Sequence, residues 1–281
     1  MNITYKFFTE TGLKRQTNQD RITAHTSEKI SLFAVADGMG GHSDGEYASE
    51  TVIKHLDAIW EKLCGFSGEF QTAVDMIISA LEKANAEIFN YAKSKKIICG
   101  STASVLLICG ELYAVINIGD SPVYRASKKK AWHESTEHSF ADVAVKSTGI
   151  SADEIDEKRG KRLVKAVGIK DRLLPSVRTG RIAGGQAFLI CSDGVSRYFT
   201  DKEIFRLLKR AAAEKIGLSE LSDTLKNRVY GMGASDNLSA ILIHARAGEK
   251  DKSDSRKIKI IIAAAVISFI LWAAVNIFIL L

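Results

Sequence analysis

Residues 101–118 read STASVLLICGELYAVINI, and this stretch decides the fold class. Its two apolar runs, 101–109 and 112–118, flank the short turn Gly110-Glu111. Two such runs joined by a two-residue turn that contains glycine predict a β-hairpin. A third short strand, 123–126, follows another glycine-containing turn. Strands that follow one another through tight turns are antiparallel, so this region favours an α+β fold over alternating βαβ units.

The rest of the chain supplies further strands and two pairs of helices. The other predicted strands are residues 31–36, 187–191 and 238–244. The predicted helices are 46–63 and 69–95, followed much later by 200–213 and 218–230. Helix 69–95 is the clearest, because its apolar residues recur at spacings of three and four. The polar residues 133–162 predict a loop or flap with short helical pieces. Paired helices and antiparallel strands together indicate α+β.

Composition describes an ordinary folded protein. Of 281 residues, 46% are hydrophobic and 26% charged, with only two prolines, which excludes a disordered tail or a collagen-like chain. The net charge is +6, and basic and acidic residues are mixed along the chain. A mixed surface with a slight positive excess does not indicate nucleic-acid binding, and we expect no nucleic-acid partner.

The C-terminal residues 260–281 read IIIAAAVISFILWAAVNIFILL and contain no charge. A helix of this length spans about 33 Å, enough to cross the hydrocarbon core of a bilayer. A buried core helix is the alternative, but the length and the apolar character on all sides favour a membrane span. The preceding linker, 249–259, holds five basic and three acidic residues. Positive flanks stay in the cytoplasm, so we expect a cytoplasmic domain, 1–248, on a single-pass tail anchor in the cell membrane.

Four aspartates stand at the ends of predicted strands, each beside Gly, Ser or Asn. They are Asp37, Asp120, Asp193 and Asp236. One Asp-Gly pair alone is only a common turn. Four carboxylates at strand ends that converge in space need a cation to balance their charge. Oxygen ligands without histidine or cysteine at matching positions suit magnesium or manganese better than zinc.

Seven short segments carry a specific resemblance. They are Arg15-Gln16-Thr17-Asn18-Gln19-Asp20, Ala36-Asp37-Gly38-Met39-Gly40-Gly41-His42, Gly100-Ser101-Thr102, Ile118-Gly119-Asp120-Ser121, Glu137-His138-Ser139, Cys191-Ser192-Asp193-Gly194 and Ser235-Asp236-Asn237. In this order, over residues 5–245, they resemble the metal-dependent protein phosphatase family (type 2C, or PPM) in its bacterial form. The resemblance implies a sandwich of two antiparallel β-sheets flanked by helices. It also implies hydrolysis of phosphoserine and phosphothreonine in proteins with two bound Mn²⁺ or Mg²⁺ ions.

The resemblance also assigns the main metal ligands. In the family pattern, Asp37 bridges the two metal ions, and the backbone carbonyl of Gly38 ligates one of them. Asp193 and Asp236 ligate the first ion. Two ions held in this way activate a water for in-line attack on phosphorus.

Further roles follow for residues around these ligands. Asp20 matches a residue near the second ion, acting through water, and Asp120 matches one that helps hold a third, weaker metal. Arg15 matches the arginine that grips the substrate phosphate, a task that suits its forked donors. His42 stands either as a proton donor to the leaving serine oxygen or as a turn residue.

Two functions are compatible with this pattern. An active phosphatase would use Arg15, Asp37, Asp193 and Asp236 as its catalytic set and would act on proteins phosphorylated by a serine/threonine kinase. The alternative is a pseudophosphatase, a phosphoprotein-binding module with little turnover. The presence of the complete aspartate set favours activity.

Overall fold

The computed structural model describes residues 1–41, 43–135 and 166–248. Residues Met1–Ala247 form one compact unit. The predicted linker and membrane span, His42 and all but the first three residues of the predicted flap lie outside the described residues. Within the described ranges, no helix has both the length and the apolar character needed to span a bilayer. The membrane anchor therefore stays a prediction from the sequence.

The described chain forms two antiparallel sheets. The first sheet has the order β1-β11-β10-β7-β8, with β1 Asn2–Glu10, β7 Val123–Ser127, β8 Ala131–His133, β10 Gly185–Cys191 and β11 Leu238–Arg246. The second has the order β2-β3-β5-β6-β9, with β2 Asp20–Thr26, β3 Ile30–Met39, β5 Ala103–Cys109, β6 Leu112–Ile118 and β9 Ser176–Arg181. The two-residue strand β4, Gly100–Ser101, pairs with the end of β3.

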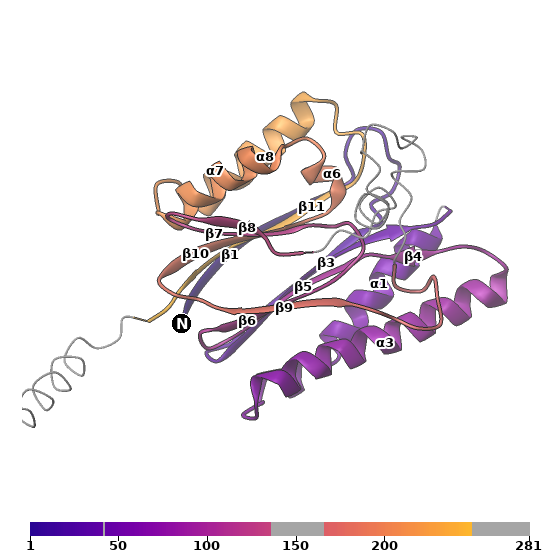
Figure 1. The fold of residues 1–281 in the computed structure, drawn as a ribbon. Helices are drawn as coiled ribbons and strands as arrows, with labels where there is room; N and C mark the ends of the chain where they lie inside the picture. The colour runs from indigo at the N-terminus through magenta and orange to yellow at the C-terminus, as the bar shows by residue number, and fades with distance from the viewer. Residues whose placement is uncertain (42, 136–165, 249–281) are drawn as a thin grey trace, which may run out of the picture. The chain divides into compact units, whose positions relative to one another are not determined.

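Helices cover the outer face of each sheet, as Figure 1 shows. The first sheet carries α7 (Asp201–Ala212) and α8 (Leu218–Gly231), with the short α6 (Asp193–Ser196) at its end. The second sheet carries α1 (Ser43–Asp57), α2 (Trp60–Cys64) and the long α3 (Phe70–Lys95). The expected sandwich of two antiparallel sheets between layers of helices is confirmed.

Three apolar clusters hold these layers together. Side chains alternate along a strand, so a strand inside a sandwich buries both of its faces. In β3, Phe33 and Val35 point into the cluster between the two sheets, where they meet Phe188 and Ile241. Leu32 and its alternate neighbours instead join the cluster under α1 and α3. The third cluster fills the space between the first sheet and the pair α7 and α8.

Three details of the sequence prediction are wrong. The strand predicted to end at Ala36 continues to Met39, because Gly38 and Met39 pair with β4. The single helix predicted at 46–63 begins earlier and divides into α1 and α2. The strand predicted at 101–109 is interrupted at Thr102, whose backbone N–H donates to the carbonyl of Asp37. Helix α7 begins at a capping box, in which Thr200 pairs with Glu203.

Candidate metal centre and active site

A pocket of about 810 Å³ opens at one end of the sandwich. Four of the sequence-predicted carboxylates line it together with Arg15: Asp37, Asp120, Asp193 and Asp236. The opposite wall is apolar and comes from the end of α3 and the residues after it, with Phe89, Ile97 and Ile98. The aspartates that are far apart in the sequence therefore meet in one place, as their positions at strand ends predict.

Asp20 and Asp37 lie opposite each other on the paired strands β2 and β3. Asp37 is inside β3 rather than after it, and its backbone N–H donates to Thr102 Oγ1 at 2.9 Å. Asp20 is buried, with 1% of its surface exposed. Ser192 Oγ donates to Asp20 Oδ2 at 2.8 Å, while Oδ1 has no hydrogen-bond partner among the described residues. A buried carboxylate oxygen without a donor is a position where a cation or a bound water fits.

Glycines let the backbone segments around the site approach one another. A Cβ added to Gly38 would lie 2.0 Å from the carbonyl oxygen of Gly45 at the start of α1. A Cβ added to Gly194 would lie 1.8 Å from the carbonyl oxygen of Asn237. Real side chains cannot occupy such positions, so both places require glycine. The close approach at Gly194 brings Asp193, at the start of α6, beside the residues just before β11, which include Asp236.

Asn237 holds the loop that carries Arg15 close to Asp193 and Asp236. Its Oδ1 accepts from the backbone N–H of Gln19 at 2.9 Å. Its Nδ2 donates to the carbonyl oxygens of Thr11 and Thr17, each at 2.9 Å. These three bonds fix both ends of the Arg15 loop against β11.

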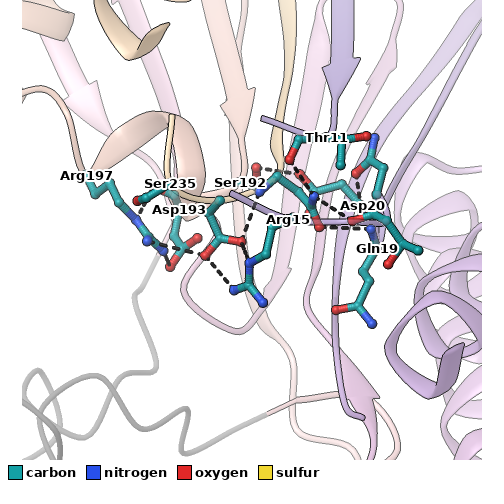
Figure 2. Close-up of polar contacts among 12 residues, drawn as sticks. Thr11, Arg15, Gln19, Asp20, Ser192, Asp193, Arg197 and Ser235 are labelled. Carbon is teal, nitrogen blue, oxygen red and sulfur yellow. Dashed lines mark hydrogen bonds and ion pairs between the residues drawn. The ribbon is translucent and has the colours of Figure 1, made fainter. Parts of the chain in front are cut away.

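Two guanidinium groups contact the carboxylates. Arg15 pairs with both oxygens of Asp236, with Nε 2.7 Å from Oδ1 and Nη2 2.9 Å from Oδ2. Arg197 pairs with Asp193, and its Nη1 also lies 3.3 Å from Asp236 Oδ2. Figure 2 shows Arg197 beside Asp193 and Ser192 near Asp20. Arg197 is not among the residues predicted from the sequence, although its spacing of four residues from Asp193 is a signal for such a pair.

The remaining negative charge shifts the carboxyl pKa values. Burial, and then the neighbouring Asp20, Asp193, Asp120 and Asp236, raise the pKa of Asp37 well above its usual range. Burial raises the pKa of Asp20 to about 6, against the opposing effect of its bond from Ser192. Burial and like charges both favour the neutral acid, so this end of the molecule needs either protons or cations.

The oxygen atoms of these residues suit a divalent cation, but they are not arranged as a complete set of ligands around one point. Within residues 1–41, 43–135 and 166–248, no three His, Cys, Asp or Glu side chains stand ready as a metal-binding group. Arg15 and Arg197 instead neutralise Asp193 and Asp236. The unpaired oxygen of Asp20 and the raised pKa of Asp37 show that this neutralisation is incomplete. An all-oxygen donor set of this kind prefers magnesium or manganese.

Comparison with known sequences identifies the family to which this fold and this site belong. Residues 13–229 match the family described as Protein phosphatase 2C. The match covers most of the chain, and the chain belongs to this family. It is a protein phosphatase.

Individual relatives share the whole domain. The chain is 27% identical over 256 residues to the serine/threonine phosphatase stp of Listeria innocua, covering 89% of this chain and 99% of the relative. It is 24% identical over 245 residues to protein phosphatase PhpP of Streptococcus pneumoniae, covering 84% and 94%.

Solved structures share the fold. A bacterial serine phosphatase superposes with a TM-score of 0.76 at 25% identity, covering 88% of this chain and 100% of that one. The catalytic domain of the serine/threonine phosphatase PstP, solved with two manganese ions, gives a TM-score of 0.70 at 24% identity, covering 86% and 97%. At that identity the second likeness supports the fold alone.

Proposed function

We propose that this protein hydrolyses phosphoserine and phosphothreonine in proteins with the help of two Mn²⁺ or Mg²⁺ ions. The observation that carries the proposal is the meeting of Asp20, Asp37, Asp193 and Asp236 at one end of the sandwich with incompletely balanced charge. The family membership and the serine/threonine phosphatases among the relatives support the same reaction.

Each residue has a distinct part in this proposal. The carboxylates of Asp37, Asp193 and Asp236 and the carbonyl of Gly38 would hold the two ions. Asp20 would lie near the second ion and act through water, and Asp120 would help to hold a third, weaker ion. When bound, the ions supply an activated water and positive charge for the phosphoryl oxygens.

Arg15 is placed to bind the substrate phosphate. Its side chain is half exposed at the pocket, and its bond with Asp236 raises the pKa of the guanidinium, which stays charged. The two donors now directed at the carboxylate have the geometry for two phosphate oxygens. Arg15 therefore exchanges one anionic partner for another when substrate binds, and orients the phosphoester for attack.

The direct test compares phosphoserine, phosphothreonine and phosphotyrosine peptides as substrates of residues 1–248. We expect release of phosphate from the first two with Mn²⁺ and none with a chelator. Turnover that continues without metal would reject the mechanism. Binding of the phosphopeptides without turnover at any metal concentration would favour the alternative, a pseudophosphatase. The expected natural substrates are proteins phosphorylated by a serine/threonine kinase.

We further propose that residues 260–281 anchor the protein in the cell membrane, with the phosphatase domain in the cytoplasm. The support is the uncharged sequence of 22 residues and the basic linker before it. Deletion of 260–281 should move the protein from the membrane fraction to the soluble fraction. A deletion variant that stays with the membrane would contradict the anchor without affecting the proposed chemistry.

A further inference from the structure

A second cluster of like charge lies on α7, away from the phosphatase pocket. A shallow hollow of about 460 Å³ around the ring of Phe205 is lined by six basic residues: Lys128, Lys202, Arg206, Lys209, Arg210 and Lys215. We call this set the basic face. Within α7 its members follow the helical repeat and leave the opposite side, with Ile204 and Leu208, buried against the sheet.

The basic face is not neutralised by its own surroundings. Of its six members, only Arg210 approaches a carboxylate in the described part of the chain, Glu220 at 3.9 Å. The acidic residues close by are engaged elsewhere. Glu203 binds Arg228, and Glu214 lies 3.2 Å from Arg246. The face therefore presents concentrated positive charge to solvent, although residues 1–248 as a whole carry only 34 basic against 30 acidic residues.

The position of the basic face is as informative as its charge. The carbonyl oxygen of Ala212, at the end of α7, lies against Gly185, which pairs with Arg246 at the end of β11. The turn at Lys128 follows β7, whose last residue pairs with Gln186. The C-terminal part of the face and the point where the chain leaves the sheet are thus at one end of the first sheet (Figure 1).

The phosphatase pocket is at the other end of the same strands. Strand β10 starts beside the end of α7 at Gly185 and finishes at Cys191, two residues before Asp193. Seven residues of strand separate the two ends by about 20 Å. A surface that touches the end of α7 therefore leaves the pocket open on the opposite side.

We propose that the basic face binds the anionic headgroups of a lipid bilayer and turns the phosphatase pocket away from it. The proposal rests on the proposed membrane anchor, which would bring the end of β11 close to a bilayer. Each lysine or arginine near an anionic surface adds attraction that falls off within a Debye length. Phe205, half buried among the basic residues, adds apolar surface to the centre of the face.

The test uses residues 1–248, without the predicted anchor, so that binding reports on the basic face alone. Residues Met1–Ala247 form one compact unit, and a solved bacterial serine phosphatase is matched over its whole length by 88% of this chain, so we expect residues 1–248 to fold without the C-terminal segment. Sedimentation is measured with vesicles of phosphatidylcholine alone and with about 30% phosphatidylserine, at several salt concentrations. We expect binding only to the anionic vesicles, weakened by salt.

Two variants with the same change in net charge make the test specific. The face variant is Arg206→Glu, Lys209→Glu and Lys215→Glu, and we expect its vesicle binding to fall more than about tenfold. The control variant is Lys62→Glu, Lys83→Glu and Lys170→Glu, three exposed residues outside the basic face. It should retain most of its vesicle binding. Both variants should keep wild-type turnover of p-nitrophenyl phosphate, because none of the six residues lines the pocket.

Three results would overturn the proposal. They are absence of wild-type binding to anionic vesicles at about 0.1 M salt, an equal loss in both variants, and tighter wild-type binding to an acidic peptide or to DNA than to the vesicles. None of these would affect the membrane anchor, which the separate deletion of 260–281 tests.

Discussion

The pocket and the basic face each gather charges of one sign, but they do so in different surroundings. At the pocket end, Asp20 is buried and Asp37 is flanked by other carboxylates, so repulsion acts through a poorly screening interior. The basic face, in contrast, is mostly exposed, and water and salt screen it. The buried carboxylates therefore need counter-charges within the folded protein, and Arg15, Arg197 and a cation provide them. The exposed basic face needs no such counter-charge in the fold and can bind a partner from outside.

The largest expected effect is the loss of turnover when the buried cluster loses one charge. Asp37→Asn keeps the shape of the side chain but removes a metal ligand, and kcat with Mn²⁺ should fall by more than about a hundredfold. In chelator the same variant should melt at a higher temperature than the wild type, because mutual repulsion is relieved.

The matched control for Asp37 is Asp223→Asn, an exposed aspartate on α8. It should change neither kcat nor Tm appreciably. A fully active Asp37→Asn, or one whose metal-free form is less stable than the wild type, would remove the distinction between the two charge clusters.

The sequence predicts the strands inside the two sheets but not the strands at the sheet edges. Strands with both faces buried, such as β3 and β6, give continuous apolar runs and were predicted. The described strands missed altogether are the four at the sheet edges: β1, β2, β8 and β9. An edge strand is paired on one side and often half solvated, so its sequence mixes polar and apolar residues. Strand β9, for example, exposes Arg178 and Arg181.

The site was also predicted only in part: its aspartates were, but the contacts between distant segments were not. The aspartates stand in short motifs beside glycine, and the structure brings them to one pocket. The continuation of β3 through Asp37 was missed, because it depends on pairing of β3 with β4 over 60 residues away. Arg197 was missed as well, since its contact with Asp236 exists only when α6 and β11 come together. Contacts between distant segments leave little trace in local sequence.

The next largest effect concerns how tightly the backbone is packed beside the pocket and beyond the end of α7. Gly194→Ala would place a Cβ 1.8 Å from the carbonyl oxygen of Asn237. Relief of this clash needs movement of α6 or β11, and we expect a loss of more than about 2 kcal/mol in the free energy of unfolding. Gly217→Ala, beyond the end of α7, meets no atom within 4 Å and should cost less than about 0.5 kcal/mol. Chemical denaturation of both variants measures the difference; equal stabilities would contradict it.

A smaller effect concerns the pH dependence of the metal-free protein. Burial raises the pKa of Asp20 to about 6, above the value of 3.8 that applies when the chain is unfolded. The folded state therefore binds this proton more tightly, and stability falls as the pH rises through the interval between the two values. In chelator, Tm should be higher at pH 5 than at pH 7. Asp20→Asn should flatten the profile, whereas a Tm that rises from pH 5 to pH 7 would contradict the uncompensated charge.

The smallest expected effect compares one arginine from each end of the sheet. Arg197 contacts Asp193 and Asp236, so in Arg197→Ala these carboxylates lose a competing cation. The Mn²⁺ concentration for half-maximal activity should fall about threefold, and Tm in chelator should fall slightly, in keeping with a partly exposed ion pair. Arg206→Ala removes an equal charge from the basic face and should change neither quantity. If Arg197→Ala instead needs more Mn²⁺, the guanidinium supports the metal ligands rather than competing with the ions for them, and Arg197 is not a counter-charge that the metal replaces.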